Sequence, residues 1–151
     1  MRKMQFSIKI QASRKKVWNT LWDDKTFRDW GNIIDEGQYM LGELKEGNKV
    51  QFISSVSGYG VTSLVKKLIP NKFVSFKQVS DTKDIGRKKR EKEWTGGMES
   101  YSLMENDGIT LNVEIDVPPG QEEIFKIRFP KALERIKILT EKKYKKHKET
   151  L

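Results

Sequence analysis

The chain has 151 residues, enough for one domain that buries a core without disulfides or bound metal. It contains no cysteine and only one histidine, His147, which excludes disulfides, thiolate nucleophiles, Ser-His triads and multi-histidine metal sites. Its 30 Lys and Arg residues exceed its 21 Asp and Glu residues, and the net charge of +9 favours acidic partners only weakly.

No apolar run approaches the roughly 20 residues that a membrane-spanning helix needs, so no membrane insertion is expected. The first residues, Met1-Arg2-Lys3-Met4, lack the apolar stretch of a signal peptide. We therefore expect a cytoplasmic protein with a single domain over residues 1–151 and a basic tail over about 142–151.

The N-terminal part predicts a strand followed by two short helices. Apolar and polar residues alternate over residues 3–10, with the period of a half-buried strand. Ser13 can cap a helix over residues 14–22, whose apolar positions have helical spacing. Asp24 can cap a second helix, and Gly31 is expected to end it.

The middle of the chain is typical of an antiparallel meander. Segments rich in Val, Ile, Phe, Tyr and Thr are separated by short runs of Gly, Pro, Asn and Asp. Strict alternation, clearest over residues 109–117, indicates that one face of the sheet is covered and the other is wet. The expected strands are 38–43, 48–57, 60–69, 72–79, 92–104 and 109–117.

A long helix is expected to cover this sheet at the C-terminus. Residues after Pro130 have helical spacing of apolar side chains. Residues 122–129 fit either a helix or a strand, because Phe125, Ile127 and Phe129 also alternate. We favour a helical segment that bends at Pro130.

Two stretches resemble a known superfamily. Ala-Ser-x-x-x-Val-Trp-x-x-Leu over residues 12–21, with Trp30 nine residues on, resembles the opening of START-like (SRPBCC) helix-grip proteins. Phe-Pro-Lys-Ala-Leu-Glu-Arg-Ile-Lys over residues 129–137 is similar to the last helix of the heat-shock ATPase activator homologues, a branch related to polyketide cyclases. The order and spacing of these stretches carry the resemblance, which covers roughly residues 3–140.

The resemblance implies an α+β helix-grip fold: a curved antiparallel sheet of about seven strands wrapped on a long C-terminal helix, with two short helices after the first strand. It also implies a cavity between sheet and helix that binds a small apolar molecule such as a lipid, steroid or polyketide. The superfamily has no universal catalytic residues, so no catalytic residue is predicted. No cofactor or metal site is predicted either, and a monomer or weak dimer is expected.

The candidate cavity residues are predicted from the alternation of apolar residues in the strands and from their helical spacing in the expected helices. The alternative is that these side chains only fill a closed core, since either arrangement produces the same pattern. Ser54, Tyr59, Gln78 and Tyr101 could orient a ligand through hydrogen bonds. The candidates for the cavity wall are Trp18, Phe27, Trp30, Phe52, Val56, Leu64, Phe76, Tyr101, Leu103, Leu111, Val113, Phe129, Leu133 and Ile136.

Two other functions remain open at this stage. The basic segments 87–92 and 142–148 could dock on a protein or a nucleic acid, of which nucleic acid is less favoured because no recognition motif accompanies the charge. A cyclase- or hydrolase-type enzyme is the third possibility. It requires at least one acid or base that points into the cavity, and the sequence-adjacent carboxylate pairs 23–24, 35–36 and 122–123 are expected to be solvated.

Overall fold

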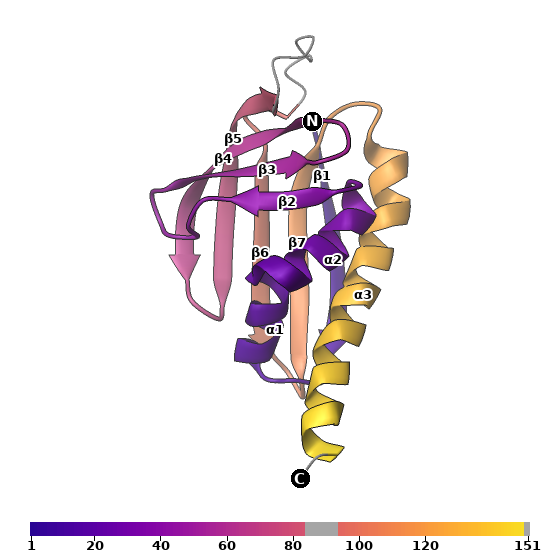
Figure 1. The fold of residues 1–151 in the computed structure, drawn as a ribbon. Helices are drawn as coiled ribbons and strands as arrows, with labels where there is room; N and C mark the ends of the chain where they lie inside the picture. Colours follow the sequence, from indigo (N-terminus) through magenta and orange to yellow (C-terminus); the bar gives the residue numbers. More distant parts are fainter. Residues whose placement is uncertain (84–93, 150–151) are drawn as a thin grey trace.

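Seven strands and three helices form the described part of the chain, residues 1–83 and 94–149 of a computed structural model. The expected α+β architecture is confirmed: one strand, two short helices, a meander and a long final helix follow each other along the chain (Figure 1). The elements are β1 (Arg2–Ile10), α1 (Arg14–Trp22), α2 (Asp24–Ile34), β2 (Gln38–Leu41), β3 (Lys49–Ser54), β4 (Tyr59–Ile69), β5 (Phe73–Lys83), β6 (Met98–Glu105), β7 (Ile109–Val117) and α3 (Glu122–Glu149).

The strands form one antiparallel sheet in the order β1-β7-β6-β5-β4-β3-β2. The first strand pairs with the last over its whole length, from Arg2 opposite Val117 to Ile10 opposite Ile109. Two register shifts interrupt the pairing of β4 with β5, one between Thr62 and Ser63 and the other near Lys67. Such bulges increase local twist, so they help the sheet to curl.

Glycine permits a very close approach between β3 and β4 at position 60. A Cβ atom added to Gly60 would lie 2.0 Å from the carbonyl oxygen of Phe52 and 2.7 Å from the Cα of Ile53. No other residue type fits against this backbone, because each would bring such a Cβ atom.

The helices pack on one face of this sheet. In Figure 1, α1 and α2 cross in front of the strands. Helix α3 runs beside the two short helices and along β1. Two polar contacts fix α3 to the short helices. The hydroxyl of Thr140 lies 2.8 Å from that of Thr20 in α1, and Arg135 forms a two-pronged ion pair with Asp29 in α2, at 2.7 and 3.0 Å. Arg135 lowers the pKa of Asp29, chiefly through this hydrogen bonding.

An aromatic cluster fills the core where α1 and α2 meet the sheet. Trp22 is its centre, with ring centroids of Phe27, Phe76 and Tyr101 between 5.0 and 6.2 Å away. Trp30 contacts the rings of Trp22, Phe27 and Tyr101. It donates its indole N–H to the carbonyl of Leu21 at 3.1 Å, which ties α2 to the end of α1. Rings packed edge to face in this way hold one another in fixed orientations.

The helix boundaries differ from the prediction at three points. Gly31 does not end α2, which continues to Ile34, since Gly31 lies inside the helix without the positive φ of a helix-ending glycine. Asp23, not Asp24, occupies the N-cap position of α2. The helical interpretation of residues 122–129 is confirmed, since α3 begins at Glu122 and contains Pro130, and the strand alternative is wrong.

The boundaries of three strands also differ from the predicted ones. β3 ends at Ser54 and not at residue 57, because the Ser54 hydroxyl accepts the backbone N–H groups of Val56 and Ser57 and turns the chain. β5 extends to Lys83. Within the described residues, the predicted strand over 92–104 begins only at Met98, after a turn around Gly96.

Candidate functional site

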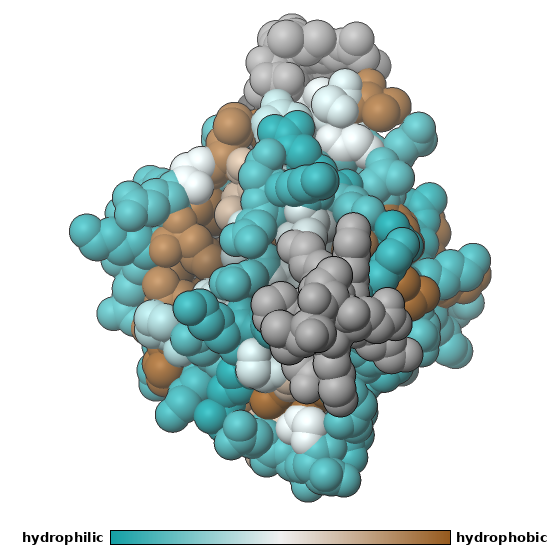
Figure 2. Space-filling model, turned by 60° about the horizontal axis from the view of Figure 1, so that its bottom comes forward, coloured by the Kyte–Doolittle hydropathy of each residue, from teal (hydrophilic) through white to brown (hydrophobic). Residues whose placement is uncertain are grey.

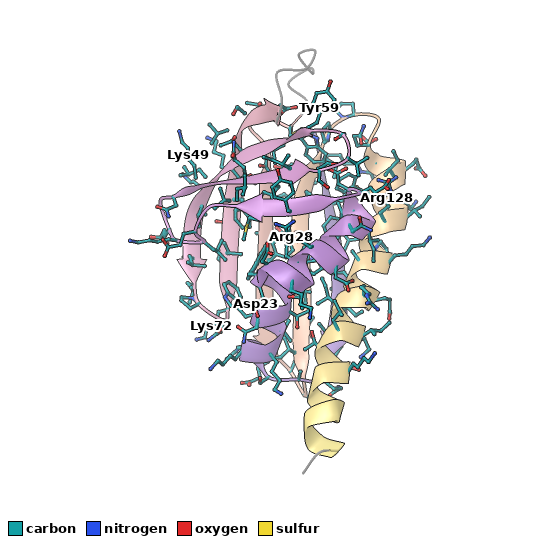
Figure 3. The ribbon with its side chains drawn as sticks, viewed as in Figure 1. Asp23, Arg28, Lys49, Tyr59, Lys72 and Arg128 are labelled. Atoms are coloured by element: carbon teal, nitrogen blue, oxygen red, sulfur yellow. The ribbon has the colours of Figure 1, made fainter. Side chains whose placement is uncertain are left out.

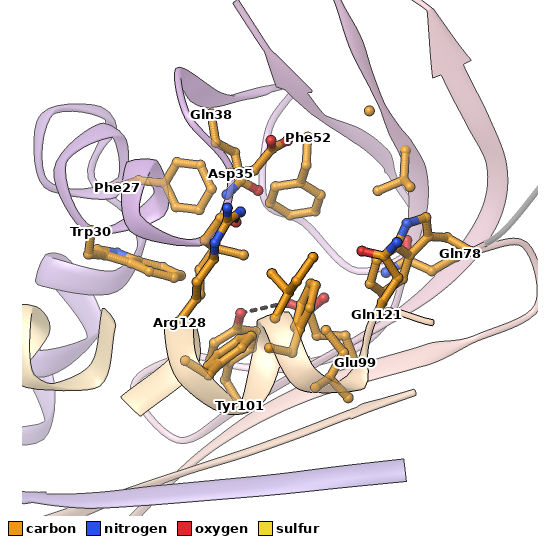
Figure 4. A pocket seen from close by; sticks show the side chains of 18 residues that line it. Phe27, Trp30, Asp35, Gln38, Phe52, Gln78, Glu99, Tyr101, Gln121 and Arg128 are labelled. Atoms are coloured by element: carbon orange, nitrogen blue, oxygen red, sulfur yellow. Dashed lines mark hydrogen bonds between the residues drawn. The ribbon is translucent and has the colours of Figure 1, made fainter. Parts of the chain in front are cut away.

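A cavity of about 260 Å³ lies between the concave face of the sheet, α2 and the first half of α3 (Figure 4). Most of its wall is aromatic or aliphatic, and the apolar residues come from every layer of the fold. They are Phe27, Trp30 and Ile34 from α2, Phe52 and Val61 from β3 and β4, Trp94, Ile115 from β7, and Ile124, Phe125 and Phe129 from α3.

A carboxyl–phenol pair interrupts this apolar wall. Glu99 and Tyr101 alternate on β6, where they pair with Phe76 and Val74 of β5 and so share the concave face. The Tyr101 hydroxyl donates a hydrogen bond of 2.5 Å to Oε2 of Glu99, drawn as a dashed line in Figure 4. The carboxyl of Glu99 therefore projects from the sheet into the cavity lining.

The surroundings of this pair change the acidity of both groups. Burial raises the pKa of Glu99 to about 7, although the hydrogen bond from Tyr101 acts in the opposite direction. Burial, and then the neighbouring Glu99, raise the pKa of Tyr101 well above its ordinary value. Near neutral pH the phenol is thus a constant hydrogen-bond donor, whereas Glu99 can either hold or release a proton.

Other polar side chains reach the same cavity. Gln78 on β5 is 4% exposed, and its Oε1 accepts a hydrogen bond from the hydroxyl of Ser63. Gln38 donates to the carbonyl of Gly31 at 2.9 Å. Arg128 of α3 donates to the carbonyl of Ile34 at 3.0 Å, which places its guanidinium beside the end of α2 (Figure 3). Asp35 and Gln121 complete the polar lining.

Comparison with solved structures gives high overall similarity at low identity. Protein MLL2253 from Mesorhizobium loti has a TM-score of 0.70 at 16% identity, covering 93% of this chain and 98% of that one. The Aha1 dimer from Colwellia psychrerythraea has a TM-score of 0.67 at 20% identity, with coverages of 91% and 95%. The chain has the helix-grip fold. No protein-family model and no curated protein sequence matches it.

A third helix-grip structure is DynU16, from the dynemicin biosynthetic locus. It has a TM-score of 0.64 at 14% identity, and the match covers 92% of this chain and 47% of DynU16. At these identities the likeness establishes the shared fold.

The helix-grip fold distributes the predicted site residues over three environments. Phe27, Trp30, Phe52, Tyr101 and Phe129 line the cavity. A second set is buried in the core without lining it, and Trp18 packs half-buried at the edge of that core, beside Trp22. The buried set is Phe76, Leu103, Leu111, Val113, Leu133 and Ile136.

Two predicted residues lie away from the cavity. Val56 is 59% exposed in the turn after β3, because that strand ends at Ser54. Leu64 pairs with the exposed Lys49 and Lys77, which places its side chain on the convex face of the sheet. Of the residues expected to orient a ligand, Gln78 and Tyr101 line the cavity. The Ser54 hydroxyl instead donates to the carbonyl of Glu36 and accepts the backbone N–H groups of Val56 and Ser57.

Glu99 is not among the residues predicted for the cavity, although the sequence contains a signal for it. Tyr101 and Leu103 were assigned to the inner face by their alternation, and one more step of two residues along β6 reaches Glu99. Gln121 and Arg128 gave no comparable signal, since their approach to the cavity depends on how α3 crosses the sheet.

The remaining sequence features add no further candidate site within the described residues. The basic residues 87–92 lie outside the described residues, and Lys142 is the last residue of the basic tail whose side chain is described. In the described parts of the chain, no three potential metal ligands gather together. No described helix is both long and apolar enough to cross a bilayer. Figure 2 shows a face that is mainly hydrophilic, with hydrophobic residues in separate patches.

Proposed function

We propose that the chain binds a small, largely apolar molecule in the cavity between the sheet and α3. The supporting observation is the cavity itself, a hollow of about 260 Å³ with aromatic walls and a few polar groups. This combination is typical of small-molecule sites. The presence of the same fold in a protein from the dynemicin biosynthetic locus adds support.

The dimensions of the cavity limit the ligand and its affinity. Its volume lies just below the range of about 300–1,000 Å³ that is common for ligand pockets, so a molecule of one or two rings fits best. Burying about 300 Å² of apolar ligand surface contributes about 7 kcal/mol. Association costs at least about 4 kcal/mol, which leaves about 3 kcal/mol. Useful affinity therefore requires the polar groups in the wall.

Filling the cavity is expected to abolish binding without unfolding the protein. Ile115 on β7 is 4% exposed, lines the cavity and pairs with Glu99. In Ile115→Phe, the phenyl ring would extend further into the hollow and occupy the space that a ligand needs. Trp30 and Trp94 line the same space, and their fluorescence should report the titration of one- and two-ring aromatic alcohols, ketones and amines. We expect at least one compound to bind the wild type and none to bind Ile115→Phe.

Val79→Phe is the matched control, since it adds the same ring at a position of β5 that is 39% exposed and outside the cavity lining. It should bind like the wild type. Equal binding by the wild type, Ile115→Phe and Val79→Phe would place the ligand elsewhere and contradict the proposal.

A second candidate function is proton transfer to or from the bound molecule. The observation that favours it is the position of Glu99 in the cavity with a pKa of about 7, where a general base works well at neutral pH. In this step the ionised carboxylate takes a proton from the carbon next to a ligand carbonyl, and the C–H electron pair forms an enolate. Return of a proton from Glu99 restores the ketone.

Hydrogen–deuterium exchange tests this candidate. We expect the protein to accelerate exchange at C2 of 1-tetralone in D2O by at least about 100-fold, as measured by NMR. Glu99→Gln should lose the acceleration, because the amide cannot accept the proton. Glu114→Gln, on the outer face of β7, should keep it. Exchange at the rate of buffer alone would dismiss this function and leave ligand binding intact.

A further inference from the structure

Two polar groups lie next to each other on the concave face, inside an otherwise aromatic hollow. Glu99 on β6 pairs with Phe76 on β5, and Gln78 is two residues further along β5 on the same face. Diagonal neighbours of this kind have Cα atoms about 7–8 Å apart, within reach of one small group held between their side chains. Figure 4 shows both side chains at the cavity wall.

Each of these groups keeps hydrogen-bonding capacity for a ligand. Tyr101 uses Oε2 of Glu99, and Oε1 has no partner among the described residues. Ser63 uses the Oε1 of Gln78, and the amide N–H groups of Gln78 make no bond to any described residue. Because Gln78 is 96% buried and lines the cavity, its amide donors are placed to bond a polar group held in the hollow.

We propose that Glu99 and Gln78 together recognise one uncharged oxygen-bearing group on the ligand, a hydroxyl above all, and that the cavity rejects ligands with a carboxylate at that position. A hydroxyl can donate to Oε1 of Glu99 and accept from the amide of Gln78, so the unused acceptor and the unused donor are both satisfied at once. This inference rests on the proposed ligand-binding function and specifies the class of ligand.

Within residues 1–83 and 94–149, no cationic side chain is paired with Glu99, and only burial and Tyr101 shift its pKa. Phe76 of β5 and Ile115 of β7 pair with Glu99, Phe125 of α3 lines the same cavity, and all three are apolar. Tyr101 on β6 is already its hydrogen-bond donor. Arg128 is exposed and bound to the carbonyl of Ile34, next to Asp35, whose negative charge opposes another anion. A ligand carboxylate beside ionised Glu99 would therefore meet repulsion in a partly dry site.

Protonation of Glu99 should relax this rejection. Burial raises the pKa of the carboxyl to about 7, so Glu99 is largely ionised at pH 8 and largely neutral at pH 5.5. A neutral Glu99 can donate its proton to a ligand carboxylate or carbonyl. The preference for the hydroxyl ligand should thus be strong at pH 8 and weak at pH 5.5.

Calorimetric titration with 2-naphthol and 2-naphthoate tests the inference, since the two probes share a ring system and differ in the polar group. At pH 8 we expect the wild type to bind 2-naphthol at least about 10-fold more tightly than 2-naphthoate. Glu99→Gln should reduce that ratio by about 10-fold, whereas Glu114→Gln on the convex face should leave it unchanged. Gln78→Met should weaken 2-naphthol binding by about 2- to 10-fold.

The possible outcomes distinguish failure of this inference from failure of the proposed ligand-binding function. Binding of 2-naphthoate as tightly as 2-naphthol at pH 8 would overturn the inference while the ligand-binding function stands. Binding of neither probe to the wild type would overturn the inference, and the ligand-binding function would also fall if no compound of the aromatic panel bound. The wild-type series between pH 5.5 and 8 requires no variant, so it decides the question even where Glu99→Gln or Gln78→Met folds poorly, and a constant ratio across that range counts against the inference.

Discussion

Replacing Glu99 with glutamine is expected to raise the free energy of unfolding by about 2–3 kcal/mol at pH 8 and to leave it nearly unchanged at pH 4.5. Burial raises the pKa of this carboxyl from 4.5 to about 7, so the folded protein holds the proton more tightly than the unfolded chain does. The contribution of protonated Glu99 to the free energy of unfolding is therefore fully present below pH 4.5 and is lost as the pH rises through 7. Glutamine is neutral at every pH and can still accept the Tyr101 hydrogen bond.

Urea unfolding at several pH values between 4.5 and 8 provides the measurement. Between the two ends of that range, the wild type should lose about 2–3 kcal/mol that Glu99→Gln retains. Glu114→Gln should follow the wild type, because its carboxyl is 40% exposed and pairs with Lys3 at a distance of 3.9 Å. Parallel profiles for the wild type and Glu99→Gln would show that the carboxyl does not titrate in a buried setting.

Replacing Phe129 with alanine should lower the free energy of unfolding by about 3–5 kcal/mol. The side chain is 2% exposed, stacks on Phe6 of β1 with centroids 5.0 Å apart and contacts Phe125 at 5.9 Å. Its removal deletes a large apolar contact between α3 and the sheet and leaves a void that the rigid surroundings cannot fill.

Ile127→Ala is the control on the same helix, because Ile127 is 58% exposed and its truncation should change stability by less than about 0.5 kcal/mol. Chemical denaturation of both variants at one pH provides the comparison. A similar small loss in both would mean that α3 is not anchored through the Phe129 ring. The void should also enlarge the cavity, so that Phe129→Ala accepts bulkier aromatic compounds than the wild type does.

The sequence predicted the architecture well because the relevant patterns are local. Residues 109–117 alternate strictly, and β7 covers the same residues with alternating buried and half-buried side chains. Ser13 was expected to cap the first helix, and its hydroxyl accepts the backbone N–H of Lys16 at 3.2 Å. Patterns of this kind depend on neighbours a few residues away, and tertiary contacts do not alter them.

Prediction of the site was less complete, because side chains reach the cavity through non-local geometry. The bulge between Val65 and Lys67 shifts the register of β4 against β5, and simple alternation does not reveal which residues change face. Leu64 lies between the buried Ser63 and Val65, so its side chain is on the convex face and not in the predicted cavity wall. Glu99 is polar in the sequence, and its half-buried position in the cavity wall depends on residues from other elements, such as Ile115 and Phe125, that meet only in the folded protein.

Gly60 limits how this hollow can be redesigned. Engineering the protein to accept other guest molecules can begin with the wall side chains, since exchanging Val61, Ile115 or Ile124 changes shape and polarity without touching the backbone scaffold. Position 60 offers no such latitude, because any added carbon would force β3 and β4 apart and flatten the curved wall. A library intended to broaden the range of guests should therefore vary the surrounding positions and keep this glycine fixed.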